Sequence, residues 1–414
     1  MEHLHLVIII VVSNDWKIKS LDIKSAFLQG QETTRKIHLK PPKEAGSLFL
    51  WLLNKTVYGL GDASREWYLK LKDELLKCGC LICIYDEALF FWMHDGVLHG
   101  IIACHVDDFL YGGSDLFHQQ VIAKIKEVFC ISKEEEDTFK YLGLQVEQSS
   151  KKIIVHQQSY INGISKVLVE GNVLNERKLV DNEYTQFRTL NGQIAWTSTQ
   201  TRPDIAFEAC QLSVAAKNAT VEDLKRANKT LKELKGNDVK IIFPNIGDLR
   251  KTILIVFSDA SFANLINSGS QEGLIIFLVG ENGSYAPLVW KSKKVKRVVK
   301  STLAAETLSL LDGAEHGMLL ASILSEIVGV NIPVKCITDN KSLCDAAYST
   351  TSIEDKRLRI DLSVIREMVR KKEITIEWRN SNLQLAGSLT KKGCSKLQLL
   401  EVLNGNFDMG LYNQ

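Results

Sequence analysis

The 414-residue sequence has few prolines, no paired framework of cysteines and no long hydrophobic run. With only six prolines and no low-complexity stretch, it offers no clear flexible linker, so we expect domains that pack closely. The nine cysteines follow neither disulfide nor zinc spacing, because Cys78, Cys80 and Cys83 lack a second ligand cluster. We interpret them as reduced thiols, which favours an intracellular, cytoplasmic or nuclear location.

Segments for membrane insertion or secretion are also missing. The apolar run Leu6–Val12 is too short to cross a bilayer and lacks the basic flank of a signal peptide. We therefore predict no membrane association. The run is interpreted as a buried helix or strand that packs under the amino-terminal domain.

The bulk composition is that of a globular protein, with 45% hydrophobic and 24% charged residues. A chain of 414 residues is long for one core and indicates two or three domains. The net charge of +2 does not by itself indicate nucleic acid, but the charge is unevenly distributed. Residues 291–300 hold six basic residues and no acidic one, which favours phosphate contact over a solvated face. For a second basic cluster, within residues 225–235, both interpretations stay open.

Acidic residues accompany two short strands near the amino terminus. Lys17–Ile23 alternates polar and apolar residues and contains Asp22, and the apolar run His99–Cys104 is followed by Asp107 and Asp108. An unpaired carboxylate is costly to bury. A pair of Mg²⁺ ions removes that cost, because aspartates hold hard cations that clamp the oxygens of a phosphoryl transfer. The alternative is an ordinary polar turn.

The order of the motifs decides between these alternatives. Asp22-Ile-Lys-Ser-Ala-Phe-Leu-Gln-Gly30 is followed by Tyr58-Gly-Leu60, then by Val106-Asp-Asp108 and by Tyr141-Leu-Gly143. The series resembles the reverse transcriptase of copia-type retrotransposon polyproteins, which carries four such motifs in this order.

Later motifs extend the resemblance over nearly the whole chain. Residues 184–213 contain Thr201-Arg-Pro-Asp204 and are similar to the segment that tethers polymerase to ribonuclease H in this family. The segments around Asp259, Glu306 and Asp339 resemble three successive ribonuclease H motifs. Gln384–Lys391 matches the terminal motif except at one position.

The alternation of strands and helices predicts a mixed α/β (α+β) fold class. Residues 1–148 would form a polymerase palm-like subdomain, and the helix-rich residues 149–248 a thumb or connection tether. Residues 249–405 contain three strands, a long helix and then alternating strands and helices, which is the order of a ribonuclease H-like mixed sheet. Residues 406–414 are predicted to be a tail.

The resemblance implies a role for each residue of the polymerase motifs. Asp22, Asp107 and Asp108 would be the catalytic carboxylates, with Asp22 and Asp107 as direct metal ligands. Phe27 would form a wall that excludes a 2′-hydroxyl, although core packing is an alternative that can hold at the same time. Tyr58 and Gly59 would approach the template or nucleotide.

The second predicted site consists of Asp259, Glu306 and Asp339. By the resemblance, these would hold two Mg²⁺ ions, with Mn²⁺ as an alternative, that activate water against the RNA strand of a hybrid. The implied partners are an RNA template, a DNA primer, an RNA–DNA hybrid and deoxynucleotide triphosphates. Basic residues expected to bind this substrate are Lys291, Lys293, Lys294, Lys296 and Arg297.

Two departures from the family pattern bear on activity. Only 21 residues precede Asp22, so we expect the fingers region with its basic nucleotide grip to be missing. Gly387 stands where the family carries a fourth ribonuclease H aspartate. Asp361, Glu377 or Ser388 are the candidates to compensate for it.

The sequence thus predicts a retrotransposon-derived RNA-directed DNA polymerase and ribonuclease H fragment with activity impaired at these two points. Two alternatives stay open. One is a catalytically decayed protein that binds nucleic acid, and the other is an internal fragment of a longer polyprotein.

Overall fold

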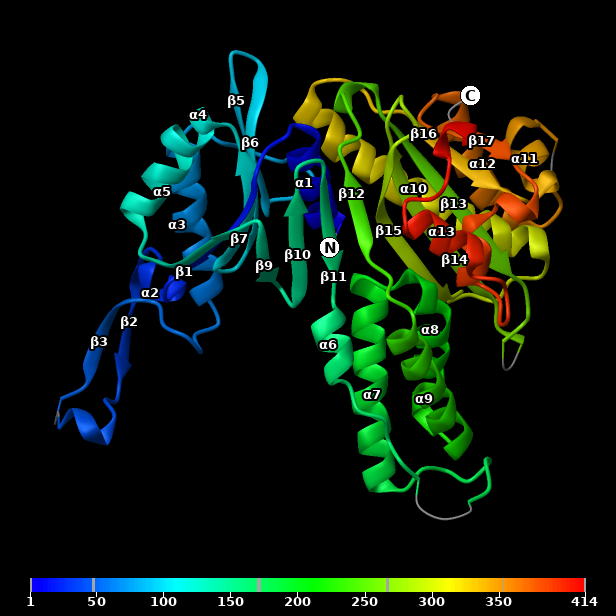
Figure 1. The fold of residues 1–414 in the computed structure, drawn as a ribbon, viewed down its shortest axis with the longest axis horizontal. Coiled ribbons are helices and arrows are strands. Elements are labelled where there is room, and N and C mark those ends of the chain that lie inside the picture. Colours follow the sequence, from blue (N-terminus) through cyan, green and yellow to red (C-terminus); the bar gives the residue numbers. More distant parts are fainter. Residues whose placement is uncertain (1, 47–48, 170–172, 266–267, 352, 413–414) are drawn as a thin grey trace. The chain divides into compact units, whose positions relative to one another are not determined.

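The computed structural model describes residues 2–46, 49–169, 173–265, 268–351 and 353–412 (Figure 1). Two compact units make up the chain. One consists of residues 15–141 and the other of residues 1–14 together with 142–414. No helix within the described ranges is both long and apolar enough to span a bilayer.

The first unit is built on a six-stranded sheet with the strand order β4-β5-β6-β7-β1-β8. Neighbouring strands are antiparallel. The strands are β1 (Ile18–Ile23), β4 (Leu81–Ile82), β5 (Leu89–His94), β6 (Val97–His105), β7 (Asp108–Gly113) and β8 (Ile131–Glu136). A separate hairpin consists of β2 (Glu32–Leu39) and β3 (Trp51–Lys55), and β9 (Thr138–Tyr141) ends the unit.

The helices of this unit pack against the sheet and contribute to the same hydrophobic core. They are α2 (Ala26–Gln29), α3 (Ala63–Lys77), α4 (Asp115–Phe117) and α5 (Ala123–Val128), with a π-helical turn at His118–Ile122. Trp67, Leu71 and Leu75 recur every four residues on α3, which gives the helix one apolar face. This face packs in one core cluster with sheet residues such as Phe109 and Tyr111.

The carboxy-terminal part of the second unit contains a five-stranded mixed sheet with the order β15-β14-β13-β16-β17. Its strands are β13 (Ile253–Ser261), β14 (Gln271–Val279), β15 (Tyr285–Lys294), β16 (Val334–Thr338) and β17 (Thr375–Trp378). The pairs among β13, β14 and β15 are antiparallel, and β16 runs parallel to both β13 and β17. This topology confirms the predicted ribonuclease H-like sheet.

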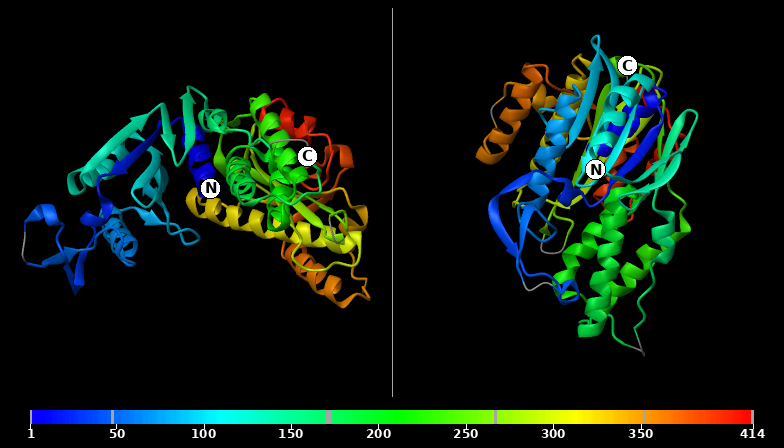
Figure 2. Two further views of the ribbon diagram at one scale, coloured as in Figure 1. Left: turned by 90° about the horizontal axis from the view of Figure 1, so that it is seen from below. Right: turned by 90° about the vertical axis from the view of Figure 1, so that its left-hand side faces the viewer.

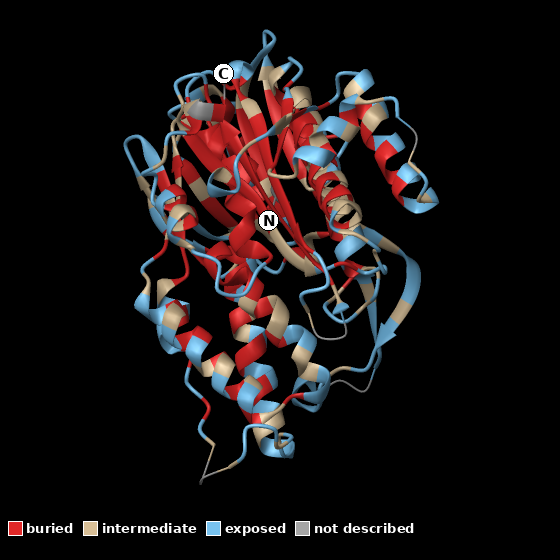
Figure 3. Ribbon diagram, turned by 90° about the vertical axis from the view of Figure 1, so that its right-hand side faces the viewer, coloured by how far each residue is buried: buried red, intermediate tan, exposed pale blue. Residues whose placement is uncertain are grey.

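Helices α10 (Thr302–Val328), α11 (Lys341–Tyr348), α12 (Lys356–Arg370) and α13 (Leu397–Leu403) accompany the sheet. The long helix α10, yellow in Figure 2, packs along β13 and β14. The central strand β14 is buried throughout and β13 is buried after its first residue, in agreement with the buried sheet in Figure 3.

Residues 142–248, which include the predicted tether (149–248), lie in the same unit. The strands of this region are β10 (Leu144–Ser149), β11 (Lys152–His156) and β12 (Ile241–Pro244), and its helices are α6 (Gln158–Gly163), α7 (Asp181–Gln200), α8 (Ala206–Ala215) and α9 (Val221–Gly236). Arg202 of the Thr-Arg-Pro-Asp motif is fully buried, donates two hydrogen bonds to Asp204, and donates to the Leu234 carbonyl oxygen at 2.7 Å. The motif therefore ties the end of α7 to α9, because a buried guanidinium requires such partners.

Helix α1 (Glu2–Ser13) contains the apolar run near the amino terminus. Leu6 and the five residues after it have no exposed surface, which confirms the predicted burial. The helix contacts β12 and β15, and the His5 ring donates from Nδ1 to the Leu288 carbonyl oxygen at 2.7 Å. The expectation that this run packs under the palm is therefore wrong, since α1 belongs to the second unit.

The residues predicted as a tail also pack against the mixed sheet. Tyr412 is fully buried, and its ring lies 5.1 Å from that of Phe257 on β13. The Tyr412 hydroxyl donates to the Leu383 carbonyl oxygen at 2.9 Å. Residues 407–412 thereby help to position the segment that follows β17.

Candidate functional site

Strand register brings the three predicted polymerase carboxylates to one end of the first sheet. Asp22 near the end of β1 lies opposite Asp108 at the start of β7, and Asp107 lies in the turn between β6 and β7. The Ile23 amide donates to the Asp107 carbonyl oxygen at 2.9 Å, and the Ser132 hydroxyl donates to Asp22. Burial raises the pKa of Asp22 and of Asp108, and the negative charge of Asp107 raises both further. The three side chains thus interact electrostatically.

A hydrogen bond from a buried tryptophan stabilises the turn that carries Asp107. Val106 has a φ of 58°, which is unfavourable for a β-branched residue. Trp67 on α3 is 1% exposed, and its indole Nε1 donates to the Val106 carbonyl oxygen at 2.6 Å. Sequence reasoning assigned no role to Trp67, although a buried indole N–H calls for an acceptor. The contact stabilises the strained turn in the conformation that presents Asp107.

Phe27 and Tyr58 lie together, with ring centroids 4.6 Å apart. Tyr58 and Gly59 occupy a turn in which the Leu60 amide donates to the Val57 carbonyl oxygen at 3.2 Å. Gly59 has a φ of 98°, the left-handed conformation that a type II turn requires at its third position. The glycine is therefore explained by the turn, and its predicted approach to a nucleotide stays a prediction.

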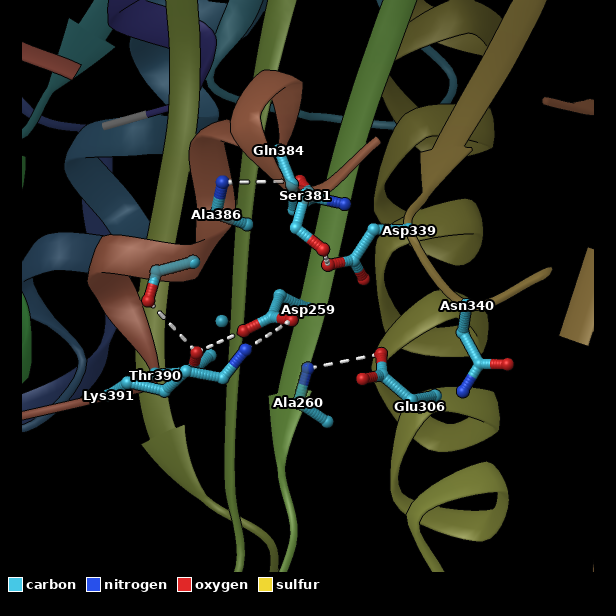
Figure 4. Close-up of polar contacts among 12 residues, drawn as sticks. Asp259, Ala260, Glu306, Asp339, Asn340, Ser381, Gln384, Ala386, Thr390 and Lys391 are labelled. Atoms are coloured by element: carbon cyan, nitrogen blue, oxygen red, sulfur yellow. Dashed lines mark hydrogen bonds and ion pairs between the residues drawn. The ribbon is translucent and has the colours of Figure 1, made fainter. Parts of the chain in front are cut away.

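The second predicted site forms a compact group of carboxylates (Figure 4). Asp259 comes from β13, Glu306 from the first turns of α10, and Asp339 follows β16. One ligand oxygen from each lies within 4.8 Å of the other two. Within the described ranges no other set of three or more histidine, cysteine or acidic residues meets this criterion, the polymerase carboxylates included.

Each carboxylate is oriented by a neighbour. The Ala260 amide donates to Glu306 at 3.1 Å, and the Ser381 hydroxyl donates to Asp339 at 2.6 Å. Asp259 accepts from the Thr390 hydroxyl and forms an ion pair with the Lys391 ammonium at 3.2 Å (Figure 4). Sequence reasoning missed the contribution of Lys391.

The three carboxylates repel one another in a largely buried setting. Burial raises the pKa of Glu306 to about 9, with further contributions from Asp259 and Asp339. Burial also raises the pKa of Asp259, against the opposing effect of Lys391. Clustered carboxylate oxygens suit hard divalent cations such as Mg²⁺ and Mn²⁺, so this donor set fits the predicted metal.

Gly387 lies in a short 3₁₀ helix, Leu385–Leu389, beside this group. It lines a pocket of about 440 Å³ together with Asp339 and Lys391. A Cβ atom at this position would have Cys394 Sγ at 3.9 Å as its nearest contact. The position can therefore accept a side chain, and that side chain would face the pocket that Asp339 lines.

Two of the three residues suggested to compensate at this position are engaged elsewhere. Asp361 pairs with Arg297, and Glu377 pairs with Arg379 and with Lys335. Ser388 lines the same pocket as Asp339 and Gly387, and its hydroxyl donates to the Leu385 carbonyl oxygen at 3.5 Å. Compensation by Ser388 therefore stays a prediction.

Part of the positive charge in residues 291–300 is neutralised within the protein. Lys293 forms ion pairs with Asp312 at 2.9 Å and Glu272 at 3.4 Å, and Lys291 contacts His316. Arg297 pairs with Asp361, whereas Lys294 and Lys296 are exposed. The predicted phosphate contacts remain a prediction, with Lys294 and Lys296 the better placed to make them.

Replacing Glu306 with glutamine should stabilise the metal-free protein at alkaline pH. The folded-state pKa of about 9 lies above the ordinary glutamate pKa of 4.5, so the folded protein retains a proton that the unfolded chain releases. The free energy of unfolding of the wild type therefore falls as the pH rises from 4.5 towards 9. We expect Glu306→Gln to unfold at least about 3 °C higher than wild type at pH 8 in EDTA, since 1 kcal/mol moves the midpoint by roughly 2–4 °C at this domain size.

The control is the same pair of proteins at pH 4, where the two unfolding temperatures should converge. If the two unfolding temperatures differed equally at both pH values, ionisation of the Glu306 carboxyl would not be the cause of the difference.

Residues 1–178 match the family model described as reverse transcriptase (RNA-dependent DNA polymerase). The predicted resemblance to copia-type retrotransposon polyproteins is confirmed.

Two relatives illustrate the similarity. The chain is 27% identical over 94% of its length to the retrovirus-related Pol polyprotein from transposon RE1 of Arabidopsis thaliana, of which it spans 27%. It is 24% identical over 94% of its length to that from transposon TNT 1-94 of Nicotiana tabacum, of which it spans 31%. A solved structure of foamy viral protease-reverse transcriptase in complex with an RNA/DNA hybrid is 11% identical, with a TM-score of 0.49, covering 90% of this chain and 45% of that one.

Proposed function

We propose that the second unit is a divalent-metal-dependent nuclease that cleaves the RNA strand of an RNA–DNA hybrid. The observation that carries this proposal is the group of Asp259, Glu306 and Asp339, whose ligand atoms lie within 4.8 Å of one another. Buried carboxylates at such distances are unfavourable unless a cation is bound. The relationship to retrotransposon Pol polyproteins favours a nucleic acid as the substrate of the site.

Asp259, Glu306 and Asp339 would hold the metal, with Mg²⁺ preferred and Mn²⁺ as an alternative. A bound metal pair would supply water activation and a clamp for the attacking and leaving oxygens. The protein orients the ligands through Ala260, Ser381 and Thr390. Lys391 would limit the charge repulsion around Asp259, with which it forms an ion pair.

The first unit would carry the RNA-directed DNA polymerase site, with an RNA template, a DNA primer and deoxynucleotide triphosphates as partners. Asp22 and Asp107 would be the metal ligands and Asp108 the third carboxylate, since strand register brings the three to one sheet end. The contact between Phe27 and Tyr58 supports an aromatic surface for the incoming sugar. Among the described residues, Asp22, Asp107 and Asp108 do not form a group within 4.8 Å as the three carboxylates of the second unit do. We therefore regard the site of the second unit as the more complete one.

Nucleic-acid binding without cleavage is the second candidate function. Gly387 favours it, because glycine offers no metal ligand and Asp361 and Glu377 form ion pairs with other residues. Exposed Lys294 and Lys296 would still contact phosphates in such a protein.

A paired assay on the purified chain tests these proposals. We expect a labelled RNA–DNA hybrid to be cleaved with Mg²⁺ or Mn²⁺ and not in EDTA, whereas primer extension on an RNA template should be the weaker activity. Asp107→Asn should remove primer extension and leave hybrid cleavage unchanged, because the two sites use separate carboxylates. Hybrid binding without metal-dependent cleavage would replace the nuclease proposal with the second candidate.

A further inference from the structure

A row of three residues crosses the mixed sheet beside the carboxylate group. Asp259 on β13 lies opposite Gly273 on β14, and Gly273 lies opposite Ser292 on β15. Directly opposite residues in antiparallel strands project from the same face of the sheet. Because Gly273 has no side chain, the row has a gap in its middle.

The segment after Gly387 fills this gap. A Cβ atom on Gly273 would lie 2.7 Å from Leu389 Cβ and 2.8 Å from Thr390 Cγ2, which is closer than such atoms approach one another. Leu389 and Thr390 therefore lie directly on the backbone of β14. Any larger residue at 273 would push them away from the sheet.

Hydrogen bonds hold the segment from both sides of the gap. On one side the Thr390 hydroxyl donates to the Asp259 carboxylate, and Lys391 pairs with the same group at 3.2 Å. On the other side the Ser292 hydroxyl donates to the Leu389 carbonyl oxygen at 2.6 Å. The position of Thr390 and Lys391 on Asp259 is thus linked to a serine on the neighbouring edge strand.

Ser292 is in turn oriented by Gln271, whose side chain contacts helix α8. The Gln271 side chain is fully buried, and its Nε2 donates to the Ser292 hydroxyl oxygen at 2.8 Å and to Cys210 Sγ at 3.3 Å. Gln211 donates to Gln271 Oε1 at 3.2 Å. Cys210 and Gln211 both lie on α8. Since Ser292 accepts from Gln271, its own hydrogen is directed to Leu389.

We propose that Ser292 and Gln271 are positioning residues for the candidate metal site, and that helix α8 of the tether is a working part of that site. The chain of contacts runs from α8 through Gln271 and Ser292 to Leu389, and so places Thr390 and Lys391 on Asp259. This inference rests on the proposed metal-dependent function. It predicts that the metal affinity depends on a polar contact two strands away from the nearest ligand.

The test measures Mn²⁺ affinity by titration calorimetry and amide hydrogen exchange of residues 385–391 in the full chain. Ser292→Ala should weaken Mn²⁺ binding by about 10-fold, as loss of groups that orient metal ligands does, and should speed exchange in this segment. Ser292→Thr keeps the hydroxyl, so its Mn²⁺ affinity and its exchange in residues 385–391 should stay at the wild-type level. Ser213→Ala on α8 is the matched control, because the Ser213 hydroxyl only donates to Ala209 of its own helix.

A second variant tests the gap independently of the serine. Gly273→Ala should displace residues 389–390 and give the same two changes, with exchange elsewhere in the sheet unchanged. Wild-type Mn²⁺ affinity in Ser292→Ala would overturn the positioning role while leaving the proposed metal site intact. Failure of the wild type to bind Mn²⁺, with residues 385–391 still protected, would overturn the metal site and the positioning role together.

Discussion

Replacing Asp259 with asparagine is expected to lower the rate of hybrid cleavage by more than about 100-fold, since losing a group that only orients a metal ligand already costs 10- to 100-fold. Asp259 is fully buried at the centre of the carboxylate group and is contacted by both Thr390 and Lys391. Asparagine has the same shape but one anionic charge fewer, so the metal affinity should fall while the fold remains. The measurements are the cleavage rate with Mn²⁺ and the Mn²⁺ affinity by calorimetry.

The matched control is Asp345→Asn on α11, which makes the same change of charge at an exposed position outside the carboxylate group. It should behave like the wild type in both measurements. Loss of cleavage in Asp259→Asn with unchanged Mn²⁺ affinity would argue against Asp259 as a metal ligand. Unchanged cleavage would argue against the site altogether.

Replacing Gly387 with aspartate is expected to raise hybrid cleavage by about 10-fold or more, the scale on which metal-site groups act. The change supplies the carboxylate that the sequence resemblance predicts at this position. Steric factors favour it, because the nearest contact of the new Cβ is Cys394 Sγ at 3.9 Å and the side chain would enter the pocket beside Asp339. The added carboxylate would strengthen metal binding at the Asp339 side of the group, since Gly387 and Asp339 line the same pocket.

Gly387→Asn is the control for this gain, since it has the same size as aspartate without the charge. Its cleavage rate should stay at the wild-type level, and Gly387→Ala reports any effect on the backbone alone. Equal gains in the aspartate and asparagine variants would assign the effect to rigidity of the 3₁₀ helix. A lower Mn²⁺ affinity in Gly387→Asp would show that the new side chain pairs with Lys391 instead.

Local pattern was sufficient to predict the order of strands and helices around the second site. Residues 253–378 alternate clearly between strand and helix periodicity, and Asp259, Glu306 and Asp339 stand at the ends of such elements. The motifs therefore predicted which carboxylates would meet. They did not predict Lys391, because its contact with Asp259 depends on the path of the chain after β17.

Features that depend on distant partners could not be predicted in this way. The role of Gly273 follows from the register of three strands, and the pairing of Lys293 with Asp312 joins a strand to a helix. The run Leu6–Val12 is apolar on all sides, so its pattern indicated burial but carried no information about which sheet would cover it. His5 meets its partner Leu288 only after the chain has passed through the whole first unit.

The placement of α1 has a consequence for recombination between diverged copies of the gene. Residues 15–141 are an insertion between α1 and the rest of the second unit, so a single crossover anywhere within them joins α1 from one parent to a sheet from the other. The mismatch would fall in a core where Leu6, Ile8 and Ile10 have no exposed surface, and close-packed interiors tolerate few changes of volume. Recombinants between diverged copies would therefore inherit a packing defect in the second unit, although the crossover itself lies within the first.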